Sequence, residues 1–146
     1  YGDYLTWPDG ERWELIGGTA RAMTPAPGTL YQAVLFQLAG QLGSWLKDKQ
    51  AMFTAPVDDR LPKADEPDDR VETVAQPDLL VVCDRTKIDR RGIRGAPDFI
   101  IEIVSPALAA WDEITKTALY QKHGVREYWT LRPADRLITI RLLTKN

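Results

Sequence analysis

The chain has 146 residues, of which 44% are hydrophobic and 27% charged. This length and composition are typical of one globular domain, residues 1–146, and exclude collagen, a coiled coil and a disordered chain. The chain holds one His and one Cys, which excludes a Cys/His zinc site and a disulfide framework within one chain. Catalysis would therefore have to come mainly from carboxylates and lysine. The single Cys favours a reducing, cytoplasmic setting.

Charge is unevenly distributed along the chain. Residues 58–72 hold seven acidic and three basic side chains, whereas residues 85–94 hold five basic side chains and one acidic one. The basic residues of the second segment are Arg85, Lys87, Arg90, Arg91 and Arg94. The net charge of −2 argues against a general nucleic-acid binder. The basic segment is therefore either a solvated loop or a local contact surface for phosphates.

Hydrophobic patterning predicts the elements of the first half. Short runs at 12–16 and 19–23 flank a Gly-Gly pair and predict a β-hairpin. Apolar residues at i, i+3, i+4 spacing predict an amphipathic helix over 31–49. Two strands are expected at 51–54 and 57–61, followed by an acidic, proline-containing loop.

The second half of the sequence predicts four strands and one helix. The runs LLVVC (79–83) and FIIEIV (99–104) are apolar enough to be buried strands, joined by a basic connection. A helix is expected from Asp112 to about His123, with Gly124 as its C-terminal stop. Two more strands are expected, at 126–131 and 136–143. The pattern predicts one α/β domain with a mixed sheet and two main helices.

Glu102 is the most informative residue, because it lies inside the apolar run FIIEIV. A charge in a buried strand costs several kcal/mol unless it is paired or bound to metal, which favours a site carboxylate over a structural ion pair. Asp78 opens the other buried strand. If the strands pair antiparallel with Asp78 opposite Glu102, their Cβ atoms lie about 4.5–5.5 Å apart, and a divalent cation could bridge them. Asp98 lies about 13 Å along the strand from Glu102 and is expected to be a strand-start or turn residue.

Lys116 is expected on the helix that follows Glu102. Asp112, Lys116 and Tyr120 repeat at i, i+4, i+8 and share one helix face. This pattern is typical of a surface Asp–Lys pair, but it also suits an ammonium group that stabilises a reacting phosphate or positions a water. Glu14, in the N-terminal hairpin, carries little information alone.

Four motifs occur in a fixed order along the chain: WELIGG, AQPDLLVV, GAPDFIIEIVSPA and WDEITKTALYQKHGVREYW. Together they resemble the Uma2 (DUF820) family of the PD-(D/E)XK, restriction-endonuclease-like superfamily. The resemblance runs from about residue 11 to residue 143, and its most specific part extends from Glu102 to Trp129. It implies an α+β restriction-endonuclease-like core, in which helices flank a mixed central sheet and a β-hairpin lies at the N-terminus.

The resemblance also implies a metal-dependent endonuclease that hydrolyses DNA with Mg²⁺ or Mn²⁺. Asp78 and Glu102 match the two motif acids, and Glu14 matches an N-terminal acid that helps to hold the metal. The lysine usually found two residues after the second acid is replaced by Val104, and the family's lysine falls on Lys116. These matches imply three metal ligands and one catalytic lysine.

Several further assignments accompany this interpretation. Gln32 stands where many family members have a His, and Gln32, Asp112 and Tyr120 are accessory candidates. The basic residues between Arg85 and Arg94 are candidates for DNA contact, and a homodimer would suit the cutting of two strands. Two other functions stay open. One is a catalytically weak or inactive nuclease fold that binds nucleic acid or protein, and the other is a metal-dependent hydrolase of another phosphate ester.

Overall fold

The computed structural model describes residues 1–8, 10–23, 28–46, 50–104 and 111–144, with only the backbone at 111 and 112. Its larger helices are α1 (Thr29–Trp45) and α2 (Thr117–His123), and a π-helical segment, η4 (Trp111–Lys116), leads into α2. Among the described residues no helix is long and apolar enough to cross a membrane.

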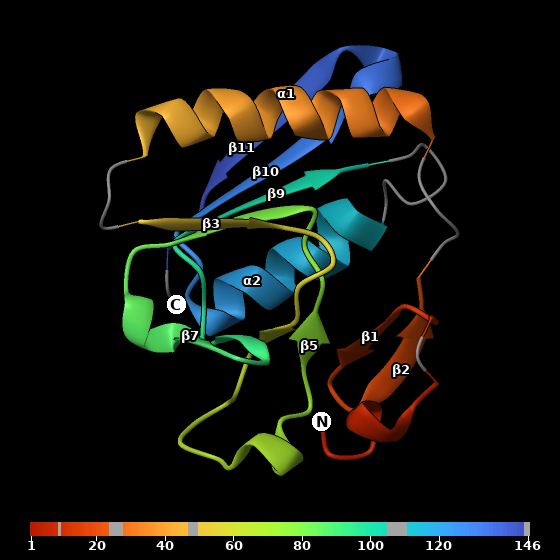
Figure 1. Cartoon of the computed structure of the whole chain (residues 1–146), viewed down its shortest axis with the longest axis vertical. Coiled ribbons are helices and arrows are strands. Elements are labelled where there is room, and N and C mark those ends of the chain that lie inside the picture. The colour runs from red at the N-terminus through yellow and green to blue at the C-terminus, as the bar shows by residue number, and fades with distance from the viewer. Residues whose placement is uncertain (9, 24–27, 47–49, 105–110, 145–146) are drawn as a thin grey trace.

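The described strands form two mixed sheets (Figure 1). One has the order β11-β10-β9-β6-β3, and its strands are β3 (Ala51–Thr54), β6 (Leu79–Val82), β9 (Phe99–Ile103), β10 (Glu127–Arg132) and β11 (Leu137–Leu142). The other has the order β2-β1-β5-β4-β8-β7, and its strands are β1 (Trp13–Ile16), β2 (Thr19–Ala22), β4 (Asp59–Arg60), β5 (Val74–Ala75), β7 (Ile88–Asp89) and β8 (Gly92–Arg94). Short 3₁₀ turns lie at Tyr4–Thr6, Asp68–Arg70, Arg85–Lys87 and Pro133–Asp135.

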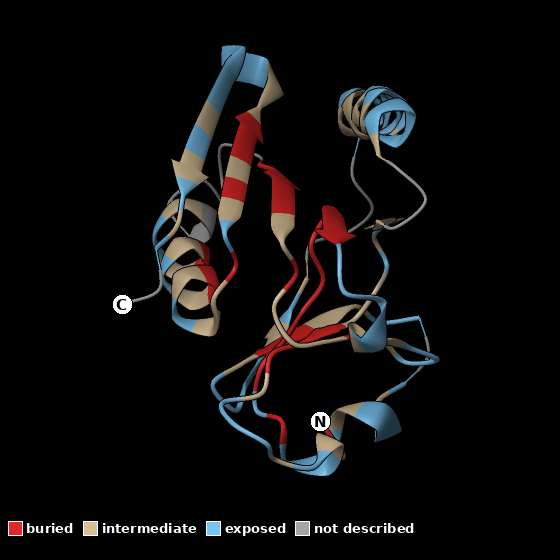
Figure 2. Cartoon of the chain, turned by 90° about the vertical axis from the view of Figure 1, so that its left-hand side faces the viewer, coloured by how far each residue is buried: buried red, intermediate tan, exposed pale blue. Residues whose placement is uncertain are grey.

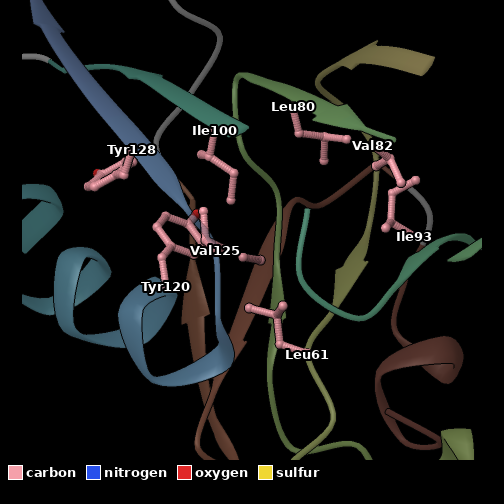
Figure 3. Packing of buried hydrophobic residues seen from close by; sticks show 9 residues of the cluster. Leu61, Leu80, Val82, Ile93, Ile100, Tyr120, Val125 and Tyr128 are labelled. Carbon is pink, nitrogen blue, oxygen red and sulfur yellow. The ribbon is translucent and has the colours of Figure 1, made fainter. Parts of the chain in front are cut away.

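Helices α1 and α2 cover opposite faces of the five-stranded sheet (Figure 1). Because side chains alternate along a strand, Leu79 and Val81 of β6 pack with residues of α1, whereas Leu80 and Val82 join the cluster that contains Tyr120 of α2. Figure 3 shows this second cluster from close by. Burial of each such aliphatic side chain stabilises the folded state by about 1.5–3 kcal/mol. The buried strands, red in Figure 2, therefore contribute much of the stability of the fold.

The strand register agrees with the expected one. Strand β6 pairs antiparallel with β9, with Leu79 opposite Ile101 and Leu80 opposite Ile100. One step further along, this register brings Asp78 opposite Glu102. The N-terminal hairpin is also confirmed, as β1 and β2, and Gly124 ends α2 with a φ of 93°, which suits glycine.

Three expected elements differ from the structure. The connection over 84–97 contains β7 and β8, which were not expected, because strands of two or three residues are too short to show an alternating pattern. The strand expected at 57–61 is limited to Asp59–Arg60. Helix α1 ends at Trp45, and residues 47–49 of the expected helix lie outside the described part of the chain.

Candidate active site

Glu102 reaches the site because of its place in the alternation of β9. It lies two residues after Ile100, on the sheet face that α2 covers, and it is 4% exposed. Two helical side chains hold the same oxygen of its carboxylate: Lys116 Nζ lies 2.8 Å from Glu102 Oε1, and the Tyr120 hydroxyl donates to it over 3.0 Å. The predicted shared face of Lys116 and Tyr120 is therefore the one that meets Glu102.

Glu14 joins this pair from the other sheet. Its Oε1 lies 3.0 Å from Lys116 Nζ and accepts a hydrogen bond of 3.2 Å from the backbone N–H of Gln76. Glu14 and Lys116 are both buried. One ammonium group thus bridges two carboxylates that lie 88 residues apart in the sequence.

Asp78 lies at the start of β6, next to this ion pair. Its Oδ2 accepts a hydrogen bond of 2.7 Å from the backbone N–H of Ile103, and its Oδ1 accepts one from the hydroxyl of Tyr31 in α1. Burial raises the pKa of Asp78, while the bonds from Tyr31 and Ile103 and the charge of Lys116 lower it. Burial has the larger effect, so the pKa of Asp78 is raised overall despite these donors.

Two residues of this site were missed by the sequence analysis. Tyr31 contacts Asp78, and burial beside that carboxylate raises the pKa of the Tyr31 hydroxyl. Arg12 precedes Glu14 by two residues, and its charge also lowers the pKa of Asp78. Arg12 Nε donates to Gln76 Oε1 over 3.1 Å, while its buried Nη2 has no partner among the described residues. The i, i+2 spacing of Arg12 and Glu14 on one strand was the signal that could have identified Arg12.

The other accessory candidates are Gln32 and Asp112. Gln32 is exposed on α1, and no side-chain hydrogen bond of Gln32 occurs within the described residues. The side chain of Asp112 lies outside them. Asp98 is structural, as expected: it accepts the backbone N–H of Cys83 over 2.8 Å and pairs with Arg126 at 2.8 Å.

The basic segment is partly neutralised by the acidic one. Arg94 Nε binds Asp68 Oδ1 at 3.0 Å, and Arg91 lies 3.6 Å from the same carboxylate. Lys87 donates to the carbonyl oxygen of Ala96 over 2.8 Å. Arg85 and Arg90 are exposed. The segment is therefore neither a free loop nor a continuous cationic surface.

The donor set of the site suits a hard divalent cation. Glu14, Asp78 and Glu102 offer only oxygen donors, which is what Mg²⁺ prefers. In the described part of the chain these three buried carboxylates outnumber the two cations that act on them, Lys116 and Arg12. In this conformation Lys116 lies between two of them, and within the described residues no three His, Cys, Asp or Glu side chains are grouped closely enough to hold an ion. The residues fit a metal by their chemistry, and its binding would compete with the ammonium group.

Comparisons with known proteins show the family and the fold of the chain. The family model Uma2, described as "Putative restriction endonuclease", matches residues 1–145. The chain is similar to a crystal structure described as "a putative nuclease belonging to DUF820", from Anabaena variabilis ATCC 29413. The TM-score is 0.75 at 19% sequence identity, with 98% of this chain and 79% of that chain covered. At this identity the likeness concerns the fold. No curated protein matches the chain.

Proposed function

Since the chain belongs to the Uma2 family, we propose that it is a divalent-metal-dependent endonuclease that hydrolyses phosphodiester bonds of DNA. One observation carries the proposal. Glu14, Glu102 and Lys116, from three elements distant in sequence, meet at one buried point beside Asp78. Among the described residues these three acids outnumber the two cations that act on them, Lys116 and Arg12, so ion pairing alone does not explain the excess acid.

Glu14, Asp78 and Glu102 would hold the metal, with Mg²⁺ or Mn²⁺ as the expected ion. When bound, such an ion lowers the pKa of a water molecule and neutralises charge on the phosphate. Tyr31 and the Ile103 N–H donate to the two oxygens of Asp78 and oppose the rise of its pKa on burial, which favours the ionised, ligating form.

Lys116 at the end of η4 and Tyr120 in α2 act on the same carboxylate. In the resting site Lys116 donates to Glu102, and the Tyr120 hydroxyl fixes the same oxygen. With a cation held by the carboxylates, the ammonium group of Lys116 would be able to donate to a water or to a phosphate oxygen. Tyr120 then keeps Glu102 in position, because its own buried hydroxyl has that carboxylate as its acceptor.

The test uses supercoiled plasmid DNA incubated with the full chain and Mg²⁺ or Mn²⁺, with EDTA as the control. We expect nicked and linear products only with metal. Absence of cleavage with either ion would contradict the proposal. A parallel reaction with single-stranded RNA of similar length distinguishes DNA from RNA as the substrate.

One observation favours a second candidate, a nuclease fold that binds nucleic acid without cutting it. Lys116 already occupies the position between Glu14 and Glu102, and if it does not leave, the acids cannot share an ion. Retention of plasmid in a gel-shift assay, without any metal-dependent nicking, would support this candidate over the endonuclease.

A further inference from the structure

A cavity of about 400 Å³ lies next to strand β4, and Gln76 forms part of its wall. Leu5 and Val57 form part of its apolar wall, and Tyr1 adds an aromatic ring. Asp58, Gln76 and the pair Arg90–Arg91 supply the polar and charged parts. The cavity is within the range of small-molecule sites, about 300–1,000 Å³.

Gln76 connects this cavity to the active site. Its backbone N–H donates to Glu14 Oε1 over 3.2 Å, and its side-chain Nε2 donates to Asp58 Oδ1 over 3.0 Å. A second connection lies beside it, because the N–H of Ala55, next to the cavity residue Pro56, donates to the carbonyl oxygen of Asp78 over 3.1 Å. Gln76 therefore links the wall of the cavity to Glu14 of the cluster.

The arginines at the rim are held in place by the backbone. Gly92 has a φ of 112°, and a Cβ there would lie 2.3 Å from the carbonyl oxygen of Asp58. Only glycine allows this close approach, which fixes the turn carrying Arg90 and Arg91 against β4. The next residue, Ile93, donates its N–H to the same oxygen over 2.8 Å. Arg90 and Arg91 are the basic residues of the segment that line this cavity, and Arg91 also lies 3.6 Å from the carboxylate of Asp68.

These walls combine three chemistries that a nucleotide needs. A nucleobase needs apolar and aromatic surface for its faces and a hydrogen-bonding group for its edge. Asp58 offers one, because within the described residues its Oδ2 accepts a single bond, from the Tyr1 hydroxyl, and keeps a further lone pair. A phosphate needs guanidinium groups. We propose that the cavity binds one nucleotide, with its base beside Leu5 and Val57 and its phosphate at Arg90 and Arg91.

In the context of DNA cleavage, this nucleotide is the neighbour of the cleaved phosphodiester. That role rests on the proposed endonuclease function, whereas binding of a free nucleotide does not. The assignment also gives part of the basic segment a definite task, because Arg90 and Arg91 are exposed and line the cavity.

Isothermal titration of the full chain with the four deoxynucleoside 5′-monophosphates tests the proposal. We expect saturable binding that Leu5→Trp weakens at least tenfold, because the larger ring fills the cavity, whereas Leu5→Met retains it. Leu5 is 49% exposed, so neither variant disturbs the buried core. We expect the double variant Arg90→Gln/Arg91→Gln to bind the nucleotides at least tenfold more weakly as well.

The control for the lost charge is Arg136→Asn. Arg136 follows the turn between β10 and β11 with a φ of 51°, a conformation that Asn tolerates. We expect this variant to bind the nucleotides as the wild type does. Inorganic phosphate is titrated separately: if it binds as tightly as the nucleotides, or if Leu5→Trp binds normally, the proposal is wrong.

Plasmid cleavage separates this proposal from the endonuclease function. Nucleotide binding without metal-dependent cleavage would support the nucleotide site and contradict the endonuclease function. Cleavage that Leu5→Trp leaves unchanged, together with no nucleotide binding, would uphold the endonuclease and overturn the cavity.

Discussion

Lys116 Nζ lies 2.8 Å from Glu102 Oε1, and both side chains are buried between α2 and the sheet that contains β9. The same nitrogen lies 3.0 Å from Glu14 Oε1 in the other sheet. One helical lysine therefore holds acids of both sheets together. The ion pairs of the site therefore also stabilise the fold.

We expect Lys116→Met to lower the free energy of unfolding by about 3–5 kcal/mol, because it leaves two carboxylates buried without their ammonium partner. Urea denaturation at pH 7 measures the change. The control is Lys122→Met, which removes an exposed lysine of the same helix and should stay within about 0.5 kcal/mol of the wild type. Equal effects of the two substitutions would contradict the buried ion pair.

Divalent cations should partly replace the missing ammonium group. We expect Mn²⁺ to raise the thermal unfolding midpoint of Lys116→Met more than that of the wild type, because the ion no longer competes with Lys116 for Glu14 and Glu102. A ligand at 100 times its Kd stabilises by about 2.7 kcal/mol. Adding Glu102→Gln to Lys116→Met should remove the gain, and a gain that persists in this double variant would place the ion elsewhere.

Tyr31→Phe tests the hydrogen bond to Asp78. Loss of a bond to a charged group should cost about 1.5–3 kcal/mol of stability at pH 7. Because the Tyr31 hydroxyl lowers the pKa of Asp78, its removal should also move the acidic limb of the cleavage rate to higher pH. Tyr4→Phe is the matched control, since it removes a 2.9 Å bond to Asp58 instead. It should leave that limb in place, and an equal shift in both variants would disprove the role of Tyr31.

The burial of Asp59, a residue outside the carboxylate cluster, predicts that the stability of the protein depends on pH. Asp59 is wholly buried, and its two carboxylate oxygens have no hydrogen-bond partner among the described residues. Burial raises the pKa of Asp59 well above its ordinary value, although Lys87 and Arg60 oppose the change. Its contribution to stability is therefore complete below the unfolded pKa of about 4, and it is lost as pH rises through the folded pKa.

Asp59→Asn cannot ionise and should gain stability relative to the wild type between pH 4 and pH 7. The gain is about 1.4 kcal/mol for each unit by which folding raises the pKa. Urea denaturation at several pH values measures it, with the exposed Asp65→Asn as the control. Parallel pH curves for Asp59→Asn and the wild type would show that Asp59 is ionised at neutral pH in the folded protein.

The sequence predicted the parts of the site that depend on strand pattern. Two apolar strands, each with one acid, have few antiparallel registers that bury both apolar faces, and the expected one, with Asp78 opposite Glu102, occurs. The helical repeat predicted that Lys116 and Tyr120 share a face. Their meeting with Glu102 follows from the packing of α2 on that sheet.

The missed features depend on contacts between distant elements. Tyr31 fits the apolar face of α1 like any other core residue, and only the position of that helix over β6 brings its hydroxyl to Asp78. The ion pairs of Asp68 with Arg91 and Arg94 likewise require β8 and the Asp68–Arg70 turn to lie side by side. Charge counts along the sequence could not show that these two segments neutralise each other.

The most direct measurement is metal-dependent plasmid nicking by Glu102→Gln beside Asp98→Asn. Both variants neutralise an acid at or just before β9, but Asp98 holds Cys83 and Arg126 outside the cluster. We expect Glu102→Gln to lose at least a hundredfold in nicking rate while Asp98→Asn cuts as the wild type does, with folding of both checked by urea denaturation. If Glu102→Gln folds and cuts as fast as Asp98→Asn, the carboxylate cluster is not the catalytic site.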